Sequence, residues 1–385
     1  MASYIIIGSG RQGIAVAYYL LRFGGAKHIT FVDEFLEKSA EASITVRKFI
    51  EPGRSLPVIT SVSMKDLQKH FSVFKDYDVV IAALPSEELL RFSILAARFG
   101  VSYCDYGPNT NIIRTQLDLH GRFSSVGATL IPNTGIGPGL TNIVAVGGSR
   151  EFDCDTVKIF IGGLPEDKNC NPLGYKSAFA NVLDGYVGKA TILENGELKK
   201  IQLPSGLENF SIGENQEIEA FFTDVGTELA TEILKKEGKI KNFWEKTLRW
   251  PGHFKFLQQL DCVGFFQTKK IQIGKTSVSP FEIARRCFDN MPRVVEDLLA
   301  FFVIFEKEGR EVARVQMVVR HNPTTGLTAM QQATSANTAI IARLLAQKEF
   351  SPGAYLPEDI VNRKFGWRFI IAELQRMNLP ISILE

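Results

Sequence analysis

Three glycines near the start of the chain have the spacing of a phosphate-binding loop. The segment IIIGSGRQG, residues 5–13, places Gly8, Gly10 and Gly13 in the pattern GxGxxG. In this pattern the first glycine permits a tight turn, the second lets a pyrophosphate approach the backbone, and the third lets a helix pack closely on a strand. The helix that follows presents free N–H donors to the phosphates, so the segment predicts dinucleotide binding.

An aspartate follows at the position that distinguishes the two nicotinamide dinucleotides. Asp33 lies 20 residues beyond Gly13, at the end of the next expected strand. A carboxylate there accepts hydrogen bonds from the adenine ribose and repels a 2′-phosphate, which favours NAD over NADP as the cofactor. The alternatives are an aspartate that only ends a surface strand, and a phosphate contact from Arg11. The expected cofactor-binding residues are Gly8, Gly10, Arg11, Gln12, Gly13, Asp33, Ala83, Leu84, Pro85 and Asn142.

A guanidinium and an imidazole stand four residues apart in TLRWPGH, residues 247–253. Arg249 offers a planar fork that binds a carboxylate through two parallel hydrogen bonds, which a lysine cannot reproduce. His253 titrates near neutrality and is suited to take a proton from an amine or to activate water. A lone arginine or histidine is more often structural, so the alternative for each is a packing role.

The glycine pattern belongs to a series of alternating strands and helices. Strands are expected at residues 4–7, 29–32, 77–84, 101–105 and 128–132, with helices at 14–23 and 87–99. The run YDVVIAAL is continuously apolar, as in a buried parallel strand, and ligands bind at the carboxyl ends of such strands. Asp105 ends one of them. Residues 1–132 are therefore expected to form a doubly wound Rossmann domain.

From about Asp155 the pattern changes to strands without intervening helices. Residues 156–162 alternate, and two further pairs of runs turn at Asn195-Gly196 and near Glu308-Gly309, which indicates hairpins. We expect an α+β domain over residues 133–328 with a largely antiparallel sheet. It includes a helix opened by Pro138 and another begun by the capping box at residues 279–282. An amphipathic helix at residues 331–347 and another at 359–377 are expected to return, within residues 329–385, to the first domain.

Composition restricts the class of protein. The chain has 385 residues, of which 45% are hydrophobic and 22% charged, as in soluble globular proteins. A net charge of +2 without a basic block argues against nucleic acid as a partner, and no apolar run reaches the roughly 18 residues of a membrane span. Without a recognisable secretory signal the protein is expected in the cytoplasm. The five scattered cysteines indicate no metal site, and a homodimer through residues 310–320 is a further hypothesis.

Motifs along nearly the whole chain resemble those of the saccharopine dehydrogenase family, and within it the lysine 6-dehydrogenases most closely. The matching segments occur in the family's order and are GSGRQG, DVVIAALP, YCDYGPN, PNTGIGPGLTN, IFIGGLP, NPLGYKSAF, EAFFTDVGT, TLRWPGH, GLTAMQQATS and GAYLPEDIV. The resemblance implies an oxidoreductase that passes hydride between a nicotinamide and a C–N bond of an amino acid. In the lysine enzymes the ε-amine carbon is oxidised to an imine. In the saccharopine enzymes the same carbon is oxidised and glutamate is the amine product.

The resemblance also implies roles for individual residues. Arg249 and Tyr175 are expected to hold the substrate carboxylate with help from Lys176, while His253 manages the proton of the amine or of water. The remaining candidates are carboxylates and a loop: Glu219 and Asp224 for the substrate α-ammonium, Asp105 for nicotinamide or ammonium, and Gly135, Gly137, Gly139 and Asn142 beside the nicotinamide. The hydride is expected to cross between the two domains.

Two positions depart from the lysine enzymes and keep alternatives open. The chain has DYGPN where those enzymes have DLGGH, which puts Asn109 in place of a histidine, and Asn133 stands where they have an aspartate. An amide cannot act as a base, which supports a nucleotide-sensing protein that has lost catalysis. The alternative within the enzymes is a saccharopine reductase or a carboxylated-polyamine dehydrogenase, whose substrate needs a second cation such as Lys176.

Overall fold

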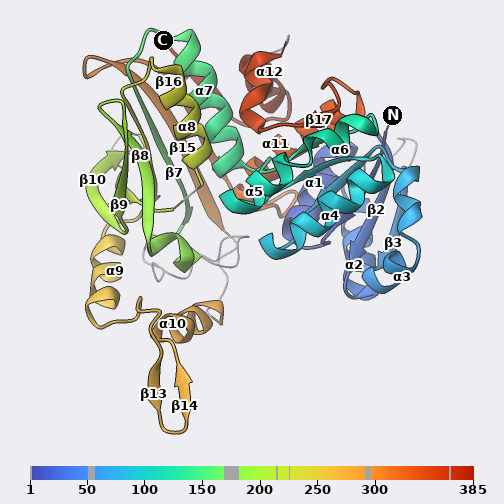
Figure 1. Ribbon diagram of the computed structural model, residues 1–385, viewed down its shortest axis with the longest axis horizontal. Helices are drawn as coiled ribbons and strands as arrows, with labels where there is room; N and C mark the ends of the chain where they lie inside the picture. The colour runs from blue at the N-terminus through green and yellow to red at the C-terminus, as the bar shows by residue number, and fades with distance from the viewer. Residues whose placement is uncertain are drawn as a thin grey trace. The chain divides into compact units, whose positions relative to one another are not determined.

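The computed structural model describes residues 2–50, 57–168, 182–213, 216–224, 226–290, 296–363 and 366–385. The chain divides into two compact units (Figure 1). The first comprises Met1–Gly147 and Gln331–Leu379, and the second comprises Gly148–Met330 and Pro380–Glu385. Tyr175 and Lys176, both predicted to contact the substrate, lie outside the described residues.

The first unit is built on a seven-stranded sheet in which every neighbouring pair is parallel. The strand order is β17-β6-β5-β4-β1-β2-β3, which reverses direction at β1, where doubly wound sheets bind their ligands. The strands are β1 (Ala2–Ile7), β2 (Ala26–Asp33), β3 (Val58–Ser63), β4 (Val79–Ala82), β5 (Ser102–Asp105), β6 (Thr129–Ile131) and β17 (Gly353–Ala354). The predicted Rossmann architecture is confirmed.

Helices flank this sheet and begin or end where the sequence indicates. The helix α4 ends at Gly100, whose φ of 69° gives the left-handed conformation of a helix C-cap. The helical segments are α1 (Arg11–Arg22), α2 (Leu36–Arg47), α3 (Met64–Lys69), η1 (Phe71–Asp76), α4 (Ser86–Phe99), α5 (Thr110–Leu117), α6 (His120–Ser125), α11 (Ala329–Ala346), η4 (Pro357–Asn362) and α12 (Gly366–Arg376).

The helix α11 was predicted to be amphipathic, with one face in solvent. Its residues from Gln331 to Ala342 are instead all buried, so this part of the helix has no exposed face. Several of its polar side chains donate hydrogen bonds to backbone carbonyls of the first unit. Asn337 Nδ2 donates to the carbonyl oxygens of Thr134 and Gly135, both at 2.9 Å. A buried helix keeps polar residues where each finds a hydrogen-bond partner, and these partners are remote in the sequence.

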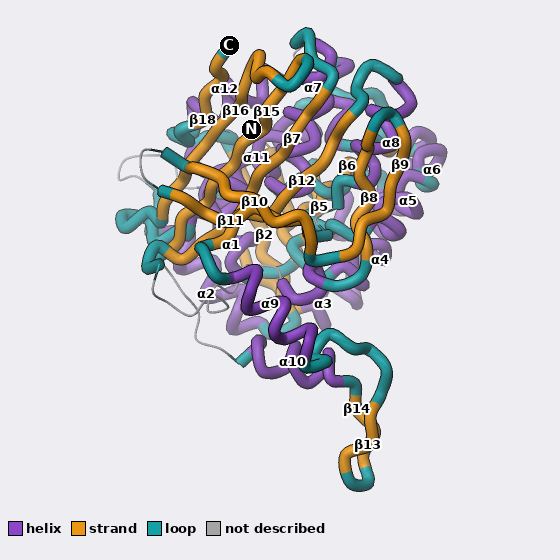
Figure 2. The backbone as a smooth tube through the Cα atoms, turned by 90° about the vertical axis from the view of Figure 1, so that its left-hand side faces the viewer, coloured by secondary structure: helices purple, strands orange, loops and turns teal. Residues whose placement is uncertain are grey.

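The second unit contains a nine-stranded mixed sheet in the order β10-β11-β12-β7-β15-β16-β18, with β8 joined to β12 and β9 (Figure 2). Among the described pairs, β12 with β7 is parallel and the others are antiparallel, so the predicted fold class is confirmed. The strands are β7 (Thr156–Pro165), β8 (Lys189–Glu194), β9 (Glu197–Gln202), β10 (Ser205–Ser211), β11 (Glu217–Phe222), β12 (Asn242–Arg249), β15 (Asp297–Lys307), β16 (Arg310–Arg320) and β18 (Ile381–Leu384).

Both predicted hairpins are present. Asn195 and Gly196, with φ of 52° and 81°, join β8 to β9, and Glu308 and Gly309, with φ of 51° and 76°, join β15 to β16. Two consecutive left-handed residues match the twist of the flanking strands. The strand β16 is paired with β15 on one side and, over residues 314–317, with β18 on the other. The hypothesis of dimerisation through this strand therefore concerns an edge that β18 already covers in part.

Helices and a small hairpin complete the second unit. They are η3 (Val182–Tyr186), α8 (Glu228–Glu237), α9 (His253–Cys262), α10 (Pro280–Asp289), β13 (Ile271–Ile273) and β14 (Thr276–Val278). As predicted, the Ser279 side chain caps α10 by accepting a hydrogen bond from Glu282 N at 3.1 Å. The helix α7 (Thr141–Glu151) connects the two units and begins three residues later than Pro138, because Gly137, Pro138 and Gly139 have non-helical backbones.

Candidate functional site

The three glycines of the N-terminal loop are required for different reasons. A Cβ at Gly8, where φ is 96°, would lie 2.2 Å from the Ala83 carbonyl oxygen, and one at Gly13 would lie 2.1 Å from the Gly8 carbonyl oxygen. These two positions are fixed by the packing of the loop on itself and on the residues after β4. A Cβ at Gly10 has no neighbour within 4 Å. The open space above Gly10 fits a pyrophosphate that approaches the backbone.

The start of α1 is suited to bind an anion. Its N-cap is Gly10, and no side chain caps the first N–H groups of the helix. The helix α11 fastens this end of α1: Gln331 Nε2 donates to the Arg11 carbonyl at 2.9 Å, and Ser335 Oγ donates to Gln12 Oε1 at 2.6 Å. Gln12, predicted to contact the cofactor, thus also holds the loop against α11 through its bond with Ser335. The spacing of residues in the sequence does not reveal this bond.

Asp33 lies where the sequence predicted, at the end of β2 beside the glycine loop. Its Oδ2 accepts hydrogen bonds from Ser9 N at 3.0 Å and Ser9 Oγ at 2.8 Å. Its Oδ1 has no hydrogen-bond partner among the described residues. Ala83, Leu84 and Pro85 follow β4 on the other side of the loop, and Ala83 N donates to the Ile7 carbonyl at 2.7 Å. One carboxylate oxygen of Asp33 therefore stays available for a ribose hydroxyl.

Asp105 holds two loops together. It is fully buried, and its Oδ1 accepts hydrogen bonds from Gly107 N at 3.0 Å and Asn133 N at 2.9 Å. Its Oδ2 accepts one from Gln116 Nε2 at 2.7 Å. Burial raises the pKa of Asp105 above its usual value. Both oxygens are engaged by protein donors, so these contacts give Asp105 a positioning role in place of the predicted contact with nicotinamide or substrate.

The two departures from the lysine enzymes have local structural uses. Asn109 caps α5 by accepting hydrogen bonds from Asn111 N and Ile112 N at 3.1 and 3.2 Å. Asn133 is buried with a φ of 57°, a left-handed conformation that asparagine tolerates better than most residues. Neither side chain therefore has contacts that suggest proton transfer.

Asn142 is bound to a buried glutamate. The amide Nδ2 donates to Glu358 Oε1 at 2.7 Å, and both residues are almost completely buried. Burial raises the pKa of Glu358 to about 7. Asn142, predicted to face the cofactor, thus has its amino group taken up by Glu358, and the pair joins α7 to η4.

The raised pKa of Glu358 predicts a pH-dependent stability. The folded protein retains the Glu358 proton over a range in which the unfolded chain has lost it. Stability is therefore lost as pH rises from the ordinary value of 4.5 through about 7, by about 3 kcal/mol in all. We expect Glu358→Gln, which cannot ionise, to lack this loss in urea unfolding at pH 4.5 to 8. The exposed Glu87→Gln should follow the wild type, and identical profiles for all three proteins would contradict the prediction.

Arg249 ends β12 in the second unit with its guanidinium oriented by protein acceptors. Its Nε donates to Tyr186 Oη at 2.8 Å, and its Nη1 donates to the Leu248 carbonyl at 2.8 Å. The side chain is half-buried, and Nη2 has no hydrogen-bond partner among the described residues. Tyr186, in η3, was not predicted as a site residue. Nε and Nη1 are thus held by the protein, and Nη2 is left for a ligand.

His253 and Glu219 lie beside this arginine, and backbone groups of the protein bind the Glu219 carboxylate. Glu219 Oε1 and Oε2 accept hydrogen bonds from Gly252 N at 2.7 Å and Phe254 N at 2.9 Å, so both oxygens cap the start of α9. His253 is the first residue of that helix and is only 2% exposed. Its ring lies 5.6 Å from that of Tyr186, measured between centroids. Glu219 therefore positions the helix start, and its contact with a substrate ammonium stays a prediction.

Asp224 lies on the turn after β11 and is exposed. Its backbone N donates to the Gly185 carbonyl at 2.9 Å, which ties this turn to the segment that carries Tyr186. The second unit thus brings Tyr186, Glu219, Arg249 and His253 into one cluster, with Asp224 at its side.

Sequence reasoning missed Glu245, which precedes Arg249 by four residues on β12. It is 4% exposed, and neither carboxylate oxygen has a hydrogen-bond partner among the described residues. Burial, and secondarily the charge of Asp224, raise the pKa of Glu245 well above its usual value. The available signal was strand alternation, which places Glu245, Thr247 and Arg249 on one face of the sheet.

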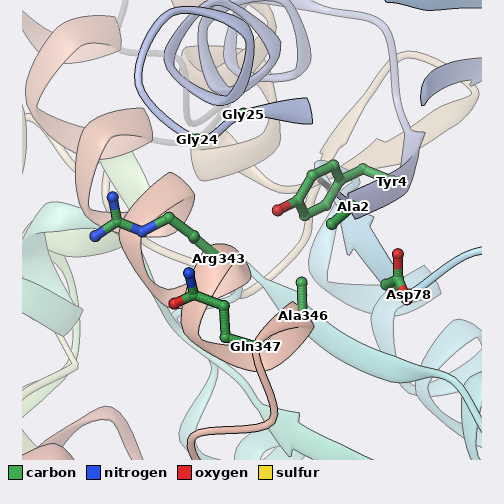
Figure 3. A pocket seen from close by; sticks show the side chains of 8 residues that line it. All are labelled: Ala2, Tyr4, Gly24, Gly25, Asp78, Arg343, Ala346 and Gln347. Carbon is green, nitrogen blue, oxygen red and sulfur yellow. The ribbon is translucent and has the colours of Figure 1, made fainter. Parts of the chain in front are cut away.

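A hollow of about 200 Å³ lies in the first unit at the amino end of β1 (Figure 3). Tyr4 points into it, and Arg343, Gly24 and Gly25 are among the residues that line it. It contains none of the predicted site residues, and Gly8 lies at the opposite end of β1. The hollow is also smaller than a typical ligand pocket, so it is not the dinucleotide site. The described residues contain no group of three or more metal-ligating side chains, and none of their helices is long and apolar enough to cross a membrane.

Comparisons with known proteins agree with this architecture. The family model described as "Saccharopine dehydrogenase C-terminal domain" matches residues 135–379. The apo saccharopine dehydrogenase (L-Glu forming) of Saccharomyces cerevisiae superposes with a TM-score of 0.78 at 16% identity, over 100% of both chains, which shows a shared fold. An engineered D-amino acid dehydrogenase bound to NADP+ (13% identity, 93% of each chain) and an amine dehydrogenase from Mycobacterium smegmatis (12% identity, 93% of this chain and 95% of that chain) both superpose with a TM-score of only 0.43.

Proposed function

The chain belongs to the saccharopine dehydrogenase family, and on that premise we propose that it catalyses the NAD-dependent oxidative deamination of the side-chain amine of L-lysine. Membership makes it an oxidoreductase that acts on an amino acid with a nicotinamide dinucleotide as cofactor. The substrate and the choice of NAD are inferred from single residues. They rest on Arg249 and Asp33 respectively.

The arrangement of Arg249 is the observation that carries the proposal. An amino-acid substrate presents an α-carboxylate, and a guanidinium whose Nε and Nη1 are held by Tyr186 and a carbonyl is already oriented to offer its Nη2 to that carboxylate. Partial burial strengthens that charge-assisted bond because less water competes for it. The carboxylate fixed in this way leaves the side-chain amine as the other polar end of the substrate.

The first unit fits the cofactor that the reaction needs. The uncapped start of α1 and the space above Gly10 suit a pyrophosphate, and the open Oδ1 of Asp33 suits a ribose hydroxyl. When bound, the nicotinamide accepts the hydride that leaves the amine carbon. Arg249 orients the substrate, and the predicted proton transfer by His253 stays a prediction, because the imidazole lies buried against Tyr186.

The test is reduction of NAD, followed by absorbance at alkaline pH, with L-lysine, saccharopine, L-ornithine and carboxynorspermidine as separate substrates. We expect turnover with L-lysine alone. Turnover of saccharopine or carboxynorspermidine in its place would transfer the proposal to the enzymes of carboxylated amines. Tight binding of NAD by calorimetry without turnover of any amine would overturn the lysine reading in favour of a nucleotide sensor.

The proposed preference for NAD gives a prediction at Asp33. Asparagine keeps an oxygen that can accept from Ser9 but removes the charge that repels a 2′-phosphate. We expect Asp33→Asn to lower the ratio of kcat/KM for NAD to that for NADP by about 10- to 100-fold, equivalent to about 1.4 to 2.7 kcal/mol. Glu34→Gln, the same change at the exposed neighbouring residue, should keep the wild-type ratio. An unchanged ratio in Asp33→Asn would contradict the assignment.

A further inference from the structure

An uncovered aromatic side chain lies on the first unit, two residues beyond Asp33. Phe35 is 51% exposed, more than any other phenylalanine among the described residues, and Leu36 beside it is 47% exposed. Burial of a phenylalanine stabilises a fold more than burial of most side chains, so a ring left in water forgoes that contribution. The exposure of Phe35 therefore points to a use outside the core of this unit.

Phe35 is also a poor residue for its place in the secondary structure. It is the N-cap of α2, where a serine or an aspartate would accept a hydrogen bond from the first turn, and its side chain makes no such bond. The side chains that α2 buries include those of Ser39, Ala42 and Val46, farther along the helix. A residue that breaks a local rule without a gain in stability is expected at a functional site.

The position of Phe35 connects it with the cofactor site. The strand β2 ends at Asp33 and α2 begins at Leu36, so Phe35 lies at the carboxyl end of a parallel strand, where doubly wound sheets bind ligands. Asp33 Oδ1 is open to a ribose hydroxyl. In NAD the adenine is bonded to the carbon next to the one that carries the 2′-hydroxyl. A dinucleotide that reaches Asp33 thus brings its base into the neighbourhood of Phe35 and Leu36.

A cation lies over the ring of Phe35. Lys38 Nζ is 5.1 Å from the ring centroid, which is within the range of a cation–π contact. Lys38 forms no ion pair with the described residues. The ammonium takes up one face of the ring, which leaves the opposite face for a flat partner. Nucleic-acid bases stack on aromatic side chains because every base has a π-face.

We propose that Phe35 stacks on the adenine of the nicotinamide dinucleotide, with Lys38 on the opposite face of the ring. Residues 33–38 then recognise the whole adenosine, since Asp33 binds its ribose and Phe35 binds its base. The contact acts on cofactor binding and not on hydride transfer, because the adenine lies at the other end of the dinucleotide from the nicotinamide. This inference rests on the proposed function for the cofactor alone and is independent of the amine substrate.

The binding experiment uses ADP-ribose, which has the adenosine and the pyrophosphate of NAD but no nicotinamide. In calorimetry, Phe35→Ala should bind ADP-ribose and NAD at least tenfold more weakly than the wild type, because the base loses its stacking partner. Phe35→Tyr keeps the ring and should match the wild type. Ile44→Ala removes an apolar side chain that is 59% exposed on the same helix, and it should also match the wild type. Thermal unfolding checks that Phe35→Ala folds.

Fluorescence and kinetics separate direct contact from an indirect effect. In Phe35→Trp the indole should be quenched when ADP-ribose stacks on it, beyond any change in the three tryptophans of the wild type. Ile44→Trp should show no such quenching. In steady-state kinetics Phe35→Ala should raise the KM for NAD at least tenfold and leave kcat unchanged.

Each outcome decides the inference. Wild-type affinity for ADP-ribose in Phe35→Ala, or an unquenched indole in Phe35→Trp, would overturn it. A changed sedimentation coefficient of Phe35→Ala with unaltered affinity would assign the ring to a contact between copies of the chain, which also overturns it. If the wild type binds ADP-ribose through Phe35 but oxidises no amine, the inference holds and the proposed function fails. A wild type that binds neither ADP-ribose nor NAD would overturn both.

Discussion

Arg249→Ala is expected to lower kcat/KM for L-lysine about 1000-fold, equivalent to about 4 kcal/mol of lost transition-state binding. Removal of one partner from a partly buried, hydrogen-bonded charge pair costs this much, because the substrate carboxylate then enters the site without a counter-charge. The guanidinium is oriented before the substrate arrives, since Tyr186 Oη and the Leu248 carbonyl hold its Nε and Nη1. Steady-state kinetics of NAD reduction measures the loss.

Cadaverine makes the test specific, because it has the amines of lysine without the carboxylate. Arg249→Ala should leave its slow oxidation unchanged, so that the variant loses the discrimination between the two amines. Arg249→Lys should recover only part of the activity, since an ammonium cannot replace the planar fork. Arg314→Ala, which removes a half-buried guanidinium paired with Glu311, is the matched control. An equal loss for lysine and cadaverine would assign Arg249 to the stability of the fold instead.

The architecture could be predicted because its signals are local. Continuous apolar runs gave the parallel strands, Gly100 marked the end of α4, and Asn195-Gly196 marked a hairpin, each through the conformation of one or two residues. The GxGxxG spacing is equally local, and Gly13 packs on Gly8 of the same motif, although Gly8 itself packs on Ala83, far along the chain. The motif can be recognised without knowledge of that distant contact.

For the candidate site residues of the second unit, the sequence could not predict the hydrogen-bond partners. Glu219 was predicted to bind an ammonium, yet its oxygens cap a helix that begins more than 30 residues later. Asp105 likewise accepts hydrogen bonds from Gln116, which lies on α5, and from Asn133, which follows β6. A carboxylate accepts any of these donors, so the residue type alone could not decide between ligand and backbone. Glu245 was missed because its distinguishing feature, a buried carboxylate without a hydrogen-bond partner among the described residues, cannot be seen in a sequence.

The helix boundary at α7 shows how local rules compete. Pro138 favours the first turn of a helix, but it stands between two glycines, and Gly139 has a φ of 125° that an L-residue rarely adopts. A Cβ at Gly139 would lie 2.8 Å from the Asn133 carbonyl oxygen. The loop therefore folds back on residue 133 before the helix begins, and the close approach outweighs the preference of the proline.

Gly10→Ala is expected to lose affinity for NAD, and Gly13→Ala is expected to lose stability, although both change one glycine of the same motif. At Gly10 the φ of −72° suits alanine and the new methyl group meets no protein atom within 4 Å. We expect the thermal unfolding of Gly10→Ala to match the wild type and its affinity for NAD to fall at least 100-fold, or about 2.7 kcal/mol, because the methyl group occupies the space of the pyrophosphate. Calorimetry with NAD measures the second quantity.

At Gly13 the methyl group collides with the Gly8 carbonyl oxygen, a backbone atom that cannot rotate away. Gly13→Ala should therefore lose about 3 kcal/mol or more of stability, as expected when a well-packed contact is forced apart. Gly121→Ala is the control, since this glycine of α6 has open space around it and should gain stability without any change in NAD binding. Normal NAD affinity in Gly10→Ala would mean that the pyrophosphate lies elsewhere. The N-terminal loop would then be only a structural turn, and the cofactor would have to bind at the end of another strand of this sheet.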